Sequence, residues 1–229
     1  MARGIYTAAY GSMEQQRRLD VIANNMANAN SPGYKKEGVH FQDMLGEITY
    51  TSQEQGPIRD TGNKLDLALF GNGYFKVQTD RGTLYTRAGN LMLNRARNLV
   101  TQDGYPVLAK SGQPVTIENT NGLQVTETGQ IFDENNPVGD LDIVQFPQGV
   151  NMKKVRNGYF EPDTKDAAPV PARGCTVRQS ALEGANFNPV EEMTRMVETI
   201  RNFEAYQKIM QVYNRDLDGQ VIAKLSGNS

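Results

Sequence analysis

The sequence has one cysteine and one histidine in 229 residues, and it has no tryptophan. Cys175 has no second cysteine with which to form an internal disulfide. With His40 as the single imidazole, the chain cannot build a metal site from several histidine and cysteine ligands. A Ser-His-Asp triad would also have to use His40, and the chain contains no nucleophile-elbow motif. We therefore expect no catalytic residue, no metal and no cofactor.

Long apolar runs and a strong net charge are also missing. No apolar run approaches the roughly 20 residues needed to cross a membrane. The N-terminal sequence MARGIYTAAYGSMEQQRR lacks the apolar core of a cleavable secretory signal. A formal net charge of −2 argues against nucleic acid or an anionic membrane as the main partner. These features favour the cytoplasm, unless the chain is exported with a signal that is not cleaved.

Proline and glycine are scarce at the two ends of the chain. All 10 prolines lie between Pro32 and Pro189, and most of the 22 glycines lie between Gly33 and Gly184. These two residue types are the poorest helix formers, so residues 5–29 and 189–225 are predicted to be helices on either side of a turn-rich centre. The two helices should pack on each other or on other copies of the chain.

The predicted first helix ends in a cluster of asparagines. Leu19, Ile22 and Met26 belong to one apolar stripe with helical spacing. Asn24, Asn25, Asn28 and Asn30 flank this stripe, although asparagine prefers caps and turns to helix interiors. Their carboxamides could bond across to a neighbouring element, or the helix could fray before Pro32. The residues alone leave both interpretations open.

The second helix has a clear predicted start, with Asn188 as N-cap, Pro189 at the first helical position and Glu191 two residues later. Polar Gln207 and Asn214 interrupt an apolar row that steps by three and four residues, a spacing typical of a coiled coil or helical bundle. The row, called here the predicted seam, consists of Met193, Met196, Ile200, Phe203, Gln207, Met210, Asn214, Leu217 and Val221.

Short alternating apolar segments between glycine turns predict an antiparallel sheet or a small barrel-like sandwich in the centre. We therefore expect an α+β fold, in which the N- and C-terminal helices pair as a coiled-coil layer beside a mainly antiparallel β domain. The expected divisions are residues 1–34 for the first helix, 35–64 for an extended connector, 65–182 for the β domain and 183–229 for the second helix.

Two blocks in the first half of the chain resemble the signatures of the flagellar rod and hook proteins. The sequence LDVIANNMANANSPGYKK carries the first through Ala23, Asn24, Asn25, Ala27, Asn28, Pro32, Gly33, Tyr34 and Lys35. The sequence LDLALFGNGYFKV carries the second through Asp66, Leu67, Ala68, Gly71, Gly73, Phe75 and Val77.

Two later blocks complete the resemblance in the family's order. The third consists of Tyr85, Thr86, Arg87, Gly89, Leu93, Asn94, Leu99, Val100, Thr101, Gly104, Tyr105 and Pro106. The fourth consists of Leu182, Glu183, Asn186, Asn188, Glu191, Met193, Met196, Arg201, Phe203, Glu204 and Lys208. The chain is therefore identified as resembling the flagellar basal-body rod protein family.

The resemblance implies a structural role. It implies export through the flagellar type III apparatus without a cleaved signal, and assembly in the periplasm with other rod and axial proteins. The short connector resembles the proximal rod type, with the distal rod type or a hook-like axial protein as the alternative. The expected assembly interface consists of Leu19, Ile22, Asn24, Asn25, Met26, Asn28, Met193, Met196, Ile200, Phe203, Gln207, Met210 and Leu217.

A different class of function is an enzyme or a carbohydrate-binding module on a β scaffold. Its candidate acids are Asp133 with Glu134, and Asp140 with Asp142. Turns account for both pairs equally well.

Overall fold

The computed structural model describes residues 2–42, 46–120, 122–134, 136–147, 149–156, 158–164 and 167–226. The chain divides into two compact units. The helical unit consists of Met1–Ala27, Glu37–Thr49 and Asn188–Ser229, and the β unit consists of Asn28–Lys36 and Tyr50–Phe187. The chain therefore passes from one unit to the other four times.

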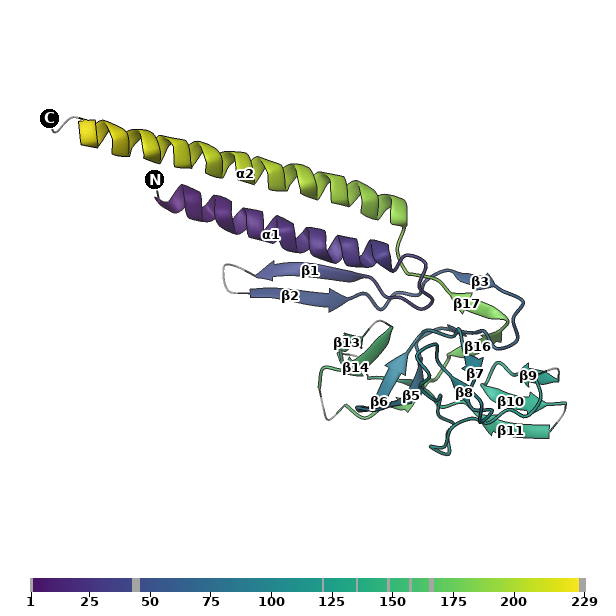
Figure 1. Ribbon diagram of the computed structural model, residues 1–229. Coiled ribbons are helices and arrows are strands. Elements are labelled where there is room, and N and C mark those ends of the chain that lie inside the picture. Colours follow the sequence, from purple (N-terminus) through teal and green to yellow (C-terminus); the bar gives the residue numbers. More distant parts are fainter. Residues whose placement is uncertain are drawn as a thin grey trace. The chain divides into compact units, whose positions relative to one another are not determined.

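Two long helices dominate the helical unit, α1 (Ala2–Ala27) and α2 (Pro189–Ser226). They lie side by side and antiparallel (Figure 1), because Asn25 near the end of α1 contacts Glu192 near the start of α2. Farther along, Ser12 accepts a hydrogen bond from Gln207. The two predicted helices are confirmed, to within a few residues at each end.

The start of α2 is built as the sequence predicts. The Asn188 side-chain oxygen accepts a hydrogen bond of 3.0 Å from the backbone N–H of Val190. Its amide group lies 3.4 Å from a carboxylate oxygen of Glu191. One of the free N–H groups of the first turn is therefore satisfied, and proline at position 189 needs no such partner.

The segment predicted as an extended connector contains three strands. Strands β1 (Glu37–Gln42) and β2 (Gly46–Thr51) form a two-stranded sheet. Strand β3 (Ile58–Asp60) instead pairs antiparallel with β17 (Ala181–Glu183), close to the point where the chain returns to the helical unit. This pairing joins segments more than 120 residues apart in sequence.

The β unit is built from short strands whose described pairings are antiparallel, which confirms the predicted α+β class. Its six-stranded sheet has the order β13-β14-β6-β5-β12-β15. Besides β3 and β17, the strands of this unit, including the six of that sheet, are β4 (Leu67–Phe70), β5 (Tyr74–Thr79), β6 (Gly82–Thr86), β7 (Met92–Leu93), β8 (Leu99–Val100), β9 (Leu123–Val125), β10 (Gln130–Asp133), β11 (Asn136–Asp140), β12 (Ile143–Gln145), β13 (Met152–Arg156), β14 (Tyr159–Pro162), β15 (Val170–Pro171) and β16 (Thr176–Gln179).

The core of the β unit gathers the inward side chains of these strands, including Phe75 and Val77 of β5, both of which are fully buried. The alternation of Leu67 and Leu69 predicts one buried and one exposed face for β4. In the structure Ala68 between them is also fully buried, so β4 is covered on both faces. Burial on both faces hides the period of two on which the prediction rests.

Candidate functional site

Both helices carry an exposed apolar surface, called here the outer stripe. On α2 it consists of Val190, Met193, Val197 and Ile200, whose side chains are 39–68% exposed. Steps of three and four residues place these four on one face of the helix. On α1 it consists of Tyr6 and Met13, seven residues apart and about 70% exposed. Large apolar side chains clustered in this way are typical of a surface that contacts another protein.

A second row on α2 faces the interior of the helical unit and is called here the inner row. It includes buried Glu192 and Thr199 and the half-buried Met196, Phe203 and Met210. The predicted seam is therefore divided between two faces. Met196, Phe203, Gln207 and Met210 are partly buried, whereas Met193 and Ile200 belong to the outer stripe. The side chain of Leu217 lies outside the described residues.

Two glycines of α1 allow tyrosines of α2 to pack closely. A Cβ atom on Gly11 would lie 2.5 Å from the ring of Tyr206. One on Gly4 would lie 2.6 Å from the hydroxyl oxygen of Tyr213. Both pairs are seven residues apart along their helices, so the same contact repeats after two turns. Tyr206 and Tyr213, which are half-buried on the same side of α2 as the inner row, therefore pack directly against the backbone of α1.

Asn25 is completely buried inside the helical unit. Its amide donates to the carbonyl oxygen of Glu37 at 2.9 Å and to a carboxylate oxygen of Glu192 at 3.1 Å. Its carbonyl oxygen accepts from the backbone N–H of Glu37 at 3.0 Å. Asn25 thus joins α1 to β1 and α2 of the same chain, and we leave it out of the proposed assembly surface. Because α1 continues past this residue, the helix does not fray here.

The other predicted residues of α1 and its end occupy different environments. Ile22 is buried, Leu19 and Met26 are half-buried, and Asn24 is exposed. Asn28 follows the helix and belongs to the β unit, where its side-chain oxygen accepts a hydrogen bond of 3.3 Å from Ser31. The asparagine cluster therefore does not form one surface.

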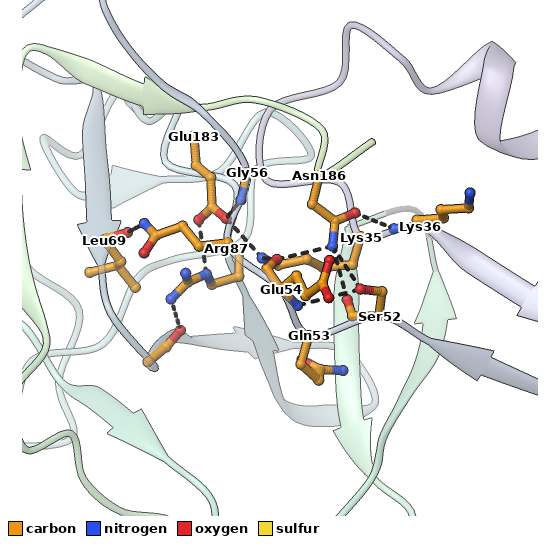
Figure 2. Close-up of polar contacts among 12 residues, drawn as sticks. Lys35, Lys36, Ser52, Gln53, Glu54, Gly56, Leu69, Arg87, Glu183 and Asn186 are labelled. Atoms are coloured by element: carbon orange, nitrogen blue, oxygen red, sulfur yellow. Dashed lines mark hydrogen bonds and ion pairs between the residues drawn. The ribbon is translucent and has the colours of Figure 1, made fainter. Parts of the chain in front are cut away.

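A network of buried charges lies in the β unit (Figure 2). One carboxylate oxygen of Glu183 accepts from Lys35 Nζ at 2.8 Å and from the backbone N–H of Gly56 at 2.9 Å. The other oxygen lies 2.9 Å from Arg87 Nε, in an ion pair that lacks the alignment of a hydrogen bond. All three charged side chains are at most 4% exposed.

The network holds two cations against one carboxylate. The Arg87 guanidinium also donates to the carbonyl oxygens of Gly71 at 2.8 Å and Gly73 at 2.6 Å. Burial lowers the pKa of Lys35, the Glu183 carboxylate opposes this shift, and the nearby Arg87 charge adds to it. Glu183 is therefore the carboxylate that pairs with both cations, and the Glu54 carboxylate adds a smaller attraction to Lys35.

Two glycines let the backbone approach this network. Gly33 has a positive φ of 66°, and a Cβ atom there would lie 2.4 Å from the carbonyl carbon of Arg87. A Cβ atom on Gly89 would lie 1.6 Å from the carbonyl oxygen of Leu67. Residues of all four signature blocks therefore meet here, which sequence reasoning missed. The sequence offers one signal for this network, because Lys35, Arg87 and Glu183 are charged residues within three of the blocks. A single sequence, however, does not tell which blocks lie close together in the fold.

Asn186 connects the segments that lead to the helical unit. Its side-chain oxygen accepts from the backbone N–H of Lys36 at 2.7 Å. Its amide donates to the carbonyl oxygens of Ser52 at 3.2 Å and Glu54 at 3.0 Å (Figure 2). The segments around residues 35, 53 and 185 are thus bonded together inside the β unit.

The acids considered for an enzyme or carbohydrate-binding site have local partners. Asp142 forms an ion pair of 3.1 Å with Lys76, and Asp140 lies 3.6 Å from Lys110. Asp133 accepts a hydrogen bond of 3.0 Å from the backbone N–H of Asn119. Within the described residues, no three His, Cys, Asp or Glu side chains form a group suited to a metal. No helix in the same part of the chain is long and apolar enough to span a membrane.

Three family models match the chain in order. Residues 5–35 match the flagella basal body rod protein model. Residues 68–132 match the D1 domain of the flagellar hook protein FlgE/F/G. Residues 178–219 match the C-terminal model of the flagellar basal body rod FlgEFG proteins. These ranges include most of each helix and the network residues Arg87 and Glu183.

Several curated proteins are similar over nearly their whole length. The flagellar basal-body rod protein FlgF of Mesorhizobium japonicum is 33% identical over 224 residues, which cover 92% of each chain. FlgG of Agrobacterium fabrum is 32% identical over 250 aligned residues, covering 91% of this chain and 94% of the relative. FlgF of Caulobacter vibrioides is 32% identical over 228 residues, with 92% and 93% coverage.

Proposed function

Since this chain belongs to the family of flagellar basal-body rod proteins, we propose that it joins the proximal rod by polymerising through its terminal helices. The protein is a structural component of the basal body, in a family that forms the axial structure of the flagellum. Its partners are other axial subunits, whether copies of itself or homologous rod proteins.

The outer stripe is the observation that carries the proposal. Its four residues on α2 and two on α1 remain exposed after α1 and α2 have packed together. Fully burying one such side chain contributes about 1.5–3 kcal/mol, so covering a partly exposed one contributes roughly half of that. Neighbouring helices with complementary apolar stripes would cover these side chains. Pairing of such helices as a coiled-coil layer is part of the proposal.

The relatives include both rod types, and length favours the proximal one. The alignment with FlgF of Mesorhizobium japonicum needs 224 positions to cover 92% of this chain, so few gaps are opened in this chain. The alignment with FlgG of Agrobacterium fabrum extends over 250 positions, so gaps must be opened in this chain. The distal rod and hook-like positions remain the alternative within the family.

We further propose that the chain has no catalytic role and travels through the flagellar type III export apparatus without a cleaved signal. Its α1 is one continuous helix that packs on α2, which favours a retained N-terminus over one removed after export. The candidate acids of a β-scaffold enzyme bind lysines or backbone groups nearby, which favours a local structural role for them.

The substitution Ile200→Asp tests the proposal because it places a charge within the outer stripe on α2. Ile200 is already exposed in the isolated chain, so the variant should fold normally and be secreted in wild-type amounts. Burying an unpaired charge is costly, and incorporation into basal bodies should fall at least tenfold. The measurement is the ratio of basal-body-bound to secreted protein in the same cells.

Asn202→Asp is the matched control. It adds the same charge to an exposed position of α2 that lies outside the stripe, on another face of the helix. It should be incorporated like wild type. Wild-type incorporation of Ile200→Asp would show that the outer stripe does not contact a neighbour, and equal loss in both variants would show that charge anywhere on α2 is harmful.

A further inference from the structure

The carboxylate of Glu183 is a single group on which two buried cations depend. It lies 2.8 Å from Lys35 Nζ and 2.9 Å from Arg87 Nε (Figure 2). Without it, Lys35 and Arg87 would be two buried positive charges. Their remaining contacts are the carbonyl oxygens of Glu54, Gly71 and Gly73 and the Tyr74 ring, whose centroid lies 5.9 Å from the guanidinium carbon of Arg87. Removing one partner of a buried ion pair is far more harmful than removing an exposed pair.

The backbone of Glu183 closes the same region. Its carbonyl oxygen accepts from Gly33 N at 2.7 Å, and its strand β17 pairs with β3. The next residue, Gly184, donates to the carbonyl oxygen of Pro57 at 2.8 Å. One short segment near the end of the β unit therefore binds segments that lie 120–150 residues earlier in the sequence.

The Lys35–Glu183 contact also shortens the connection between the two helices. Lys35 follows the last residue of α1 by eight positions, and Glu183 precedes the first residue of α2 by six. In an open chain the two helices are separated by roughly 160 residues, whereas the contact reduces the flexible path to about 14. By loop-closure entropy this raises the effective concentration of one helix for the other roughly 40-fold.

We propose that Lys35, Arg87 and Glu183 form a folding lock: the β unit closes only when Glu183 has reached the two cations, and closure promotes pairing of α1 with α2. A chain in which the segment carrying Glu183 is not yet available, during synthesis or passage through a channel, would keep its β unit open. Residues 35 and 183 must therefore both have left the ribosome or the channel before the subunit can complete its fold.

The substitution Glu183→Gln tests the lock in the full-length monomer, where polymerisation plays no part. It keeps the size and the acceptor for the Gly56 N–H but removes the charge. Cys175 is the single cysteine of the chain and packs partly buried against the β core, so its labelling rate by a thiol reagent reports opening of the β unit. We expect labelling to rise on the order of 100-fold, together with a lower thermal midpoint for the helical ellipticity.

Asp60→Asn is the control, because Asp60 lies in β3 beside the network and forms an exposed ion pair of 3.1 Å with Arg178. It should leave both measurements unchanged. A second variant, Lys35→Met combined with Glu183→Gln, should label more slowly than Glu183→Gln alone, since one unbalanced cation has been removed.

Three results would overturn the lock. One is a wild-type labelling rate in Glu183→Gln. Another is a double variant that labels at least as fast as Glu183→Gln alone. The third is a β unit that opens while the helical midpoint stays at the wild-type value, which would show that closure and helix pairing are independent.

Discussion

Single glycines of the β unit set how closely its segments approach each other. We predict that Gly89→Ala destabilises the β unit by about 3 kcal/mol or more, because its Cβ would overlap the carbonyl oxygen of Leu67 at 1.6 Å. The backbone must move, and the hydrogen bond from Leu67 N to Gly89 O must lengthen or break. The measurement is the midpoint of denaturant-induced unfolding, with the labelling of Cys175 by a thiol reagent as the signal.

Gly139→Ala provides the comparison for this prediction. Gly139 lies in β11, where an added Cβ would have no atom within 4 Å, and it is not among the glycines of positive φ. Its substitution should change stability by less than about 0.5 kcal/mol. If both alanine variants unfold alike, the close approach at Gly89 does not limit stability.

Buried tyrosines make the β unit sensitive to alkaline pH. Burial raises the pKa of Tyr74 from 10.0 to about 12 and raises the pKa of Tyr159 still further. A tyrosine that ionises in the unfolded chain at about pH 10 but stays protonated in the folded chain lowers stability as pH rises. We predict a loss of about 1.4 kcal/mol per pH unit for each such tyrosine between pH 10.5 and 12.

The shift at Lys35 has the opposite sign at lower pH. Its pKa is lowered below 10.5 by burial, so between the lowered value and 10.5 its contribution to stability rises with pH. Above pH 10.5 the lysine is deprotonated in both states, and the tyrosines determine the slope. Urea unfolding at several pH values measures this slope of unfolding free energy against pH. The substitution Tyr74→Phe should reduce it. An unchanged slope in that variant would show that Tyr74 ionises equally in both states.

Asn25 of α1 forms hydrogen bonds with both β1 and α2 in the helical unit. We predict that Asn25→Ala lowers the unfolding free energy of this unit by about 2–4 kcal/mol, because both backbone groups of Glu37 and the buried Glu192 carboxylate lose a partner. Asn202 is an exposed residue of α2 in the same unit, and Asn202→Ala should cost less than about 0.5 kcal/mol. Helical ellipticity during thermal unfolding distinguishes the two, and equal midpoints would contradict the assigned role of Asn25.

At the scale of elements, the sequence predicts where the helices lie but not which faces they bury. Helical periodicity and the Asn188-Pro189 start locate α2 within a residue or two. Met196, Phe203 and Met210 of the inner row belong to the predicted seam, whereas Glu192, Thr199 and Tyr206 on the same face escape prediction because they are polar or amphipathic. A local contact makes the burial of each possible. Glu192 accepts a hydrogen bond from Asn25, Thr199 donates to the carbonyl oxygen of Arg195, and Tyr206 packs against Gly11. Apolar content alone therefore does not tell whether the inner row or the outer stripe is the face that α2 buries against α1.

At the scale of the whole molecule, the chain begins and ends in one unit and crosses four times to the other. The distribution of proline and glycine predicts a helix at each end and a turn-rich centre, but it gives no sign that Glu37–Thr49 belongs to the helical unit. The meeting of Lys35, Arg87 and Glu183 could not be predicted, because it depends on long-range pairings such as β3 with β17. Hydrophobic pattern also gives no signal for a buried charge.

The central claim is that the outer stripe of the helices is covered by neighbouring subunits in the rod. Met13 and Met193 belong to this stripe and are 68% and 53% exposed in the free chain. Their oxidation by dilute peroxide can be measured by mass spectrometry in purified monomer and in isolated basal bodies, without any substitution. The account predicts that both methionines are oxidised at least tenfold more slowly in basal bodies. Equal oxidation rates in the two samples would contradict it.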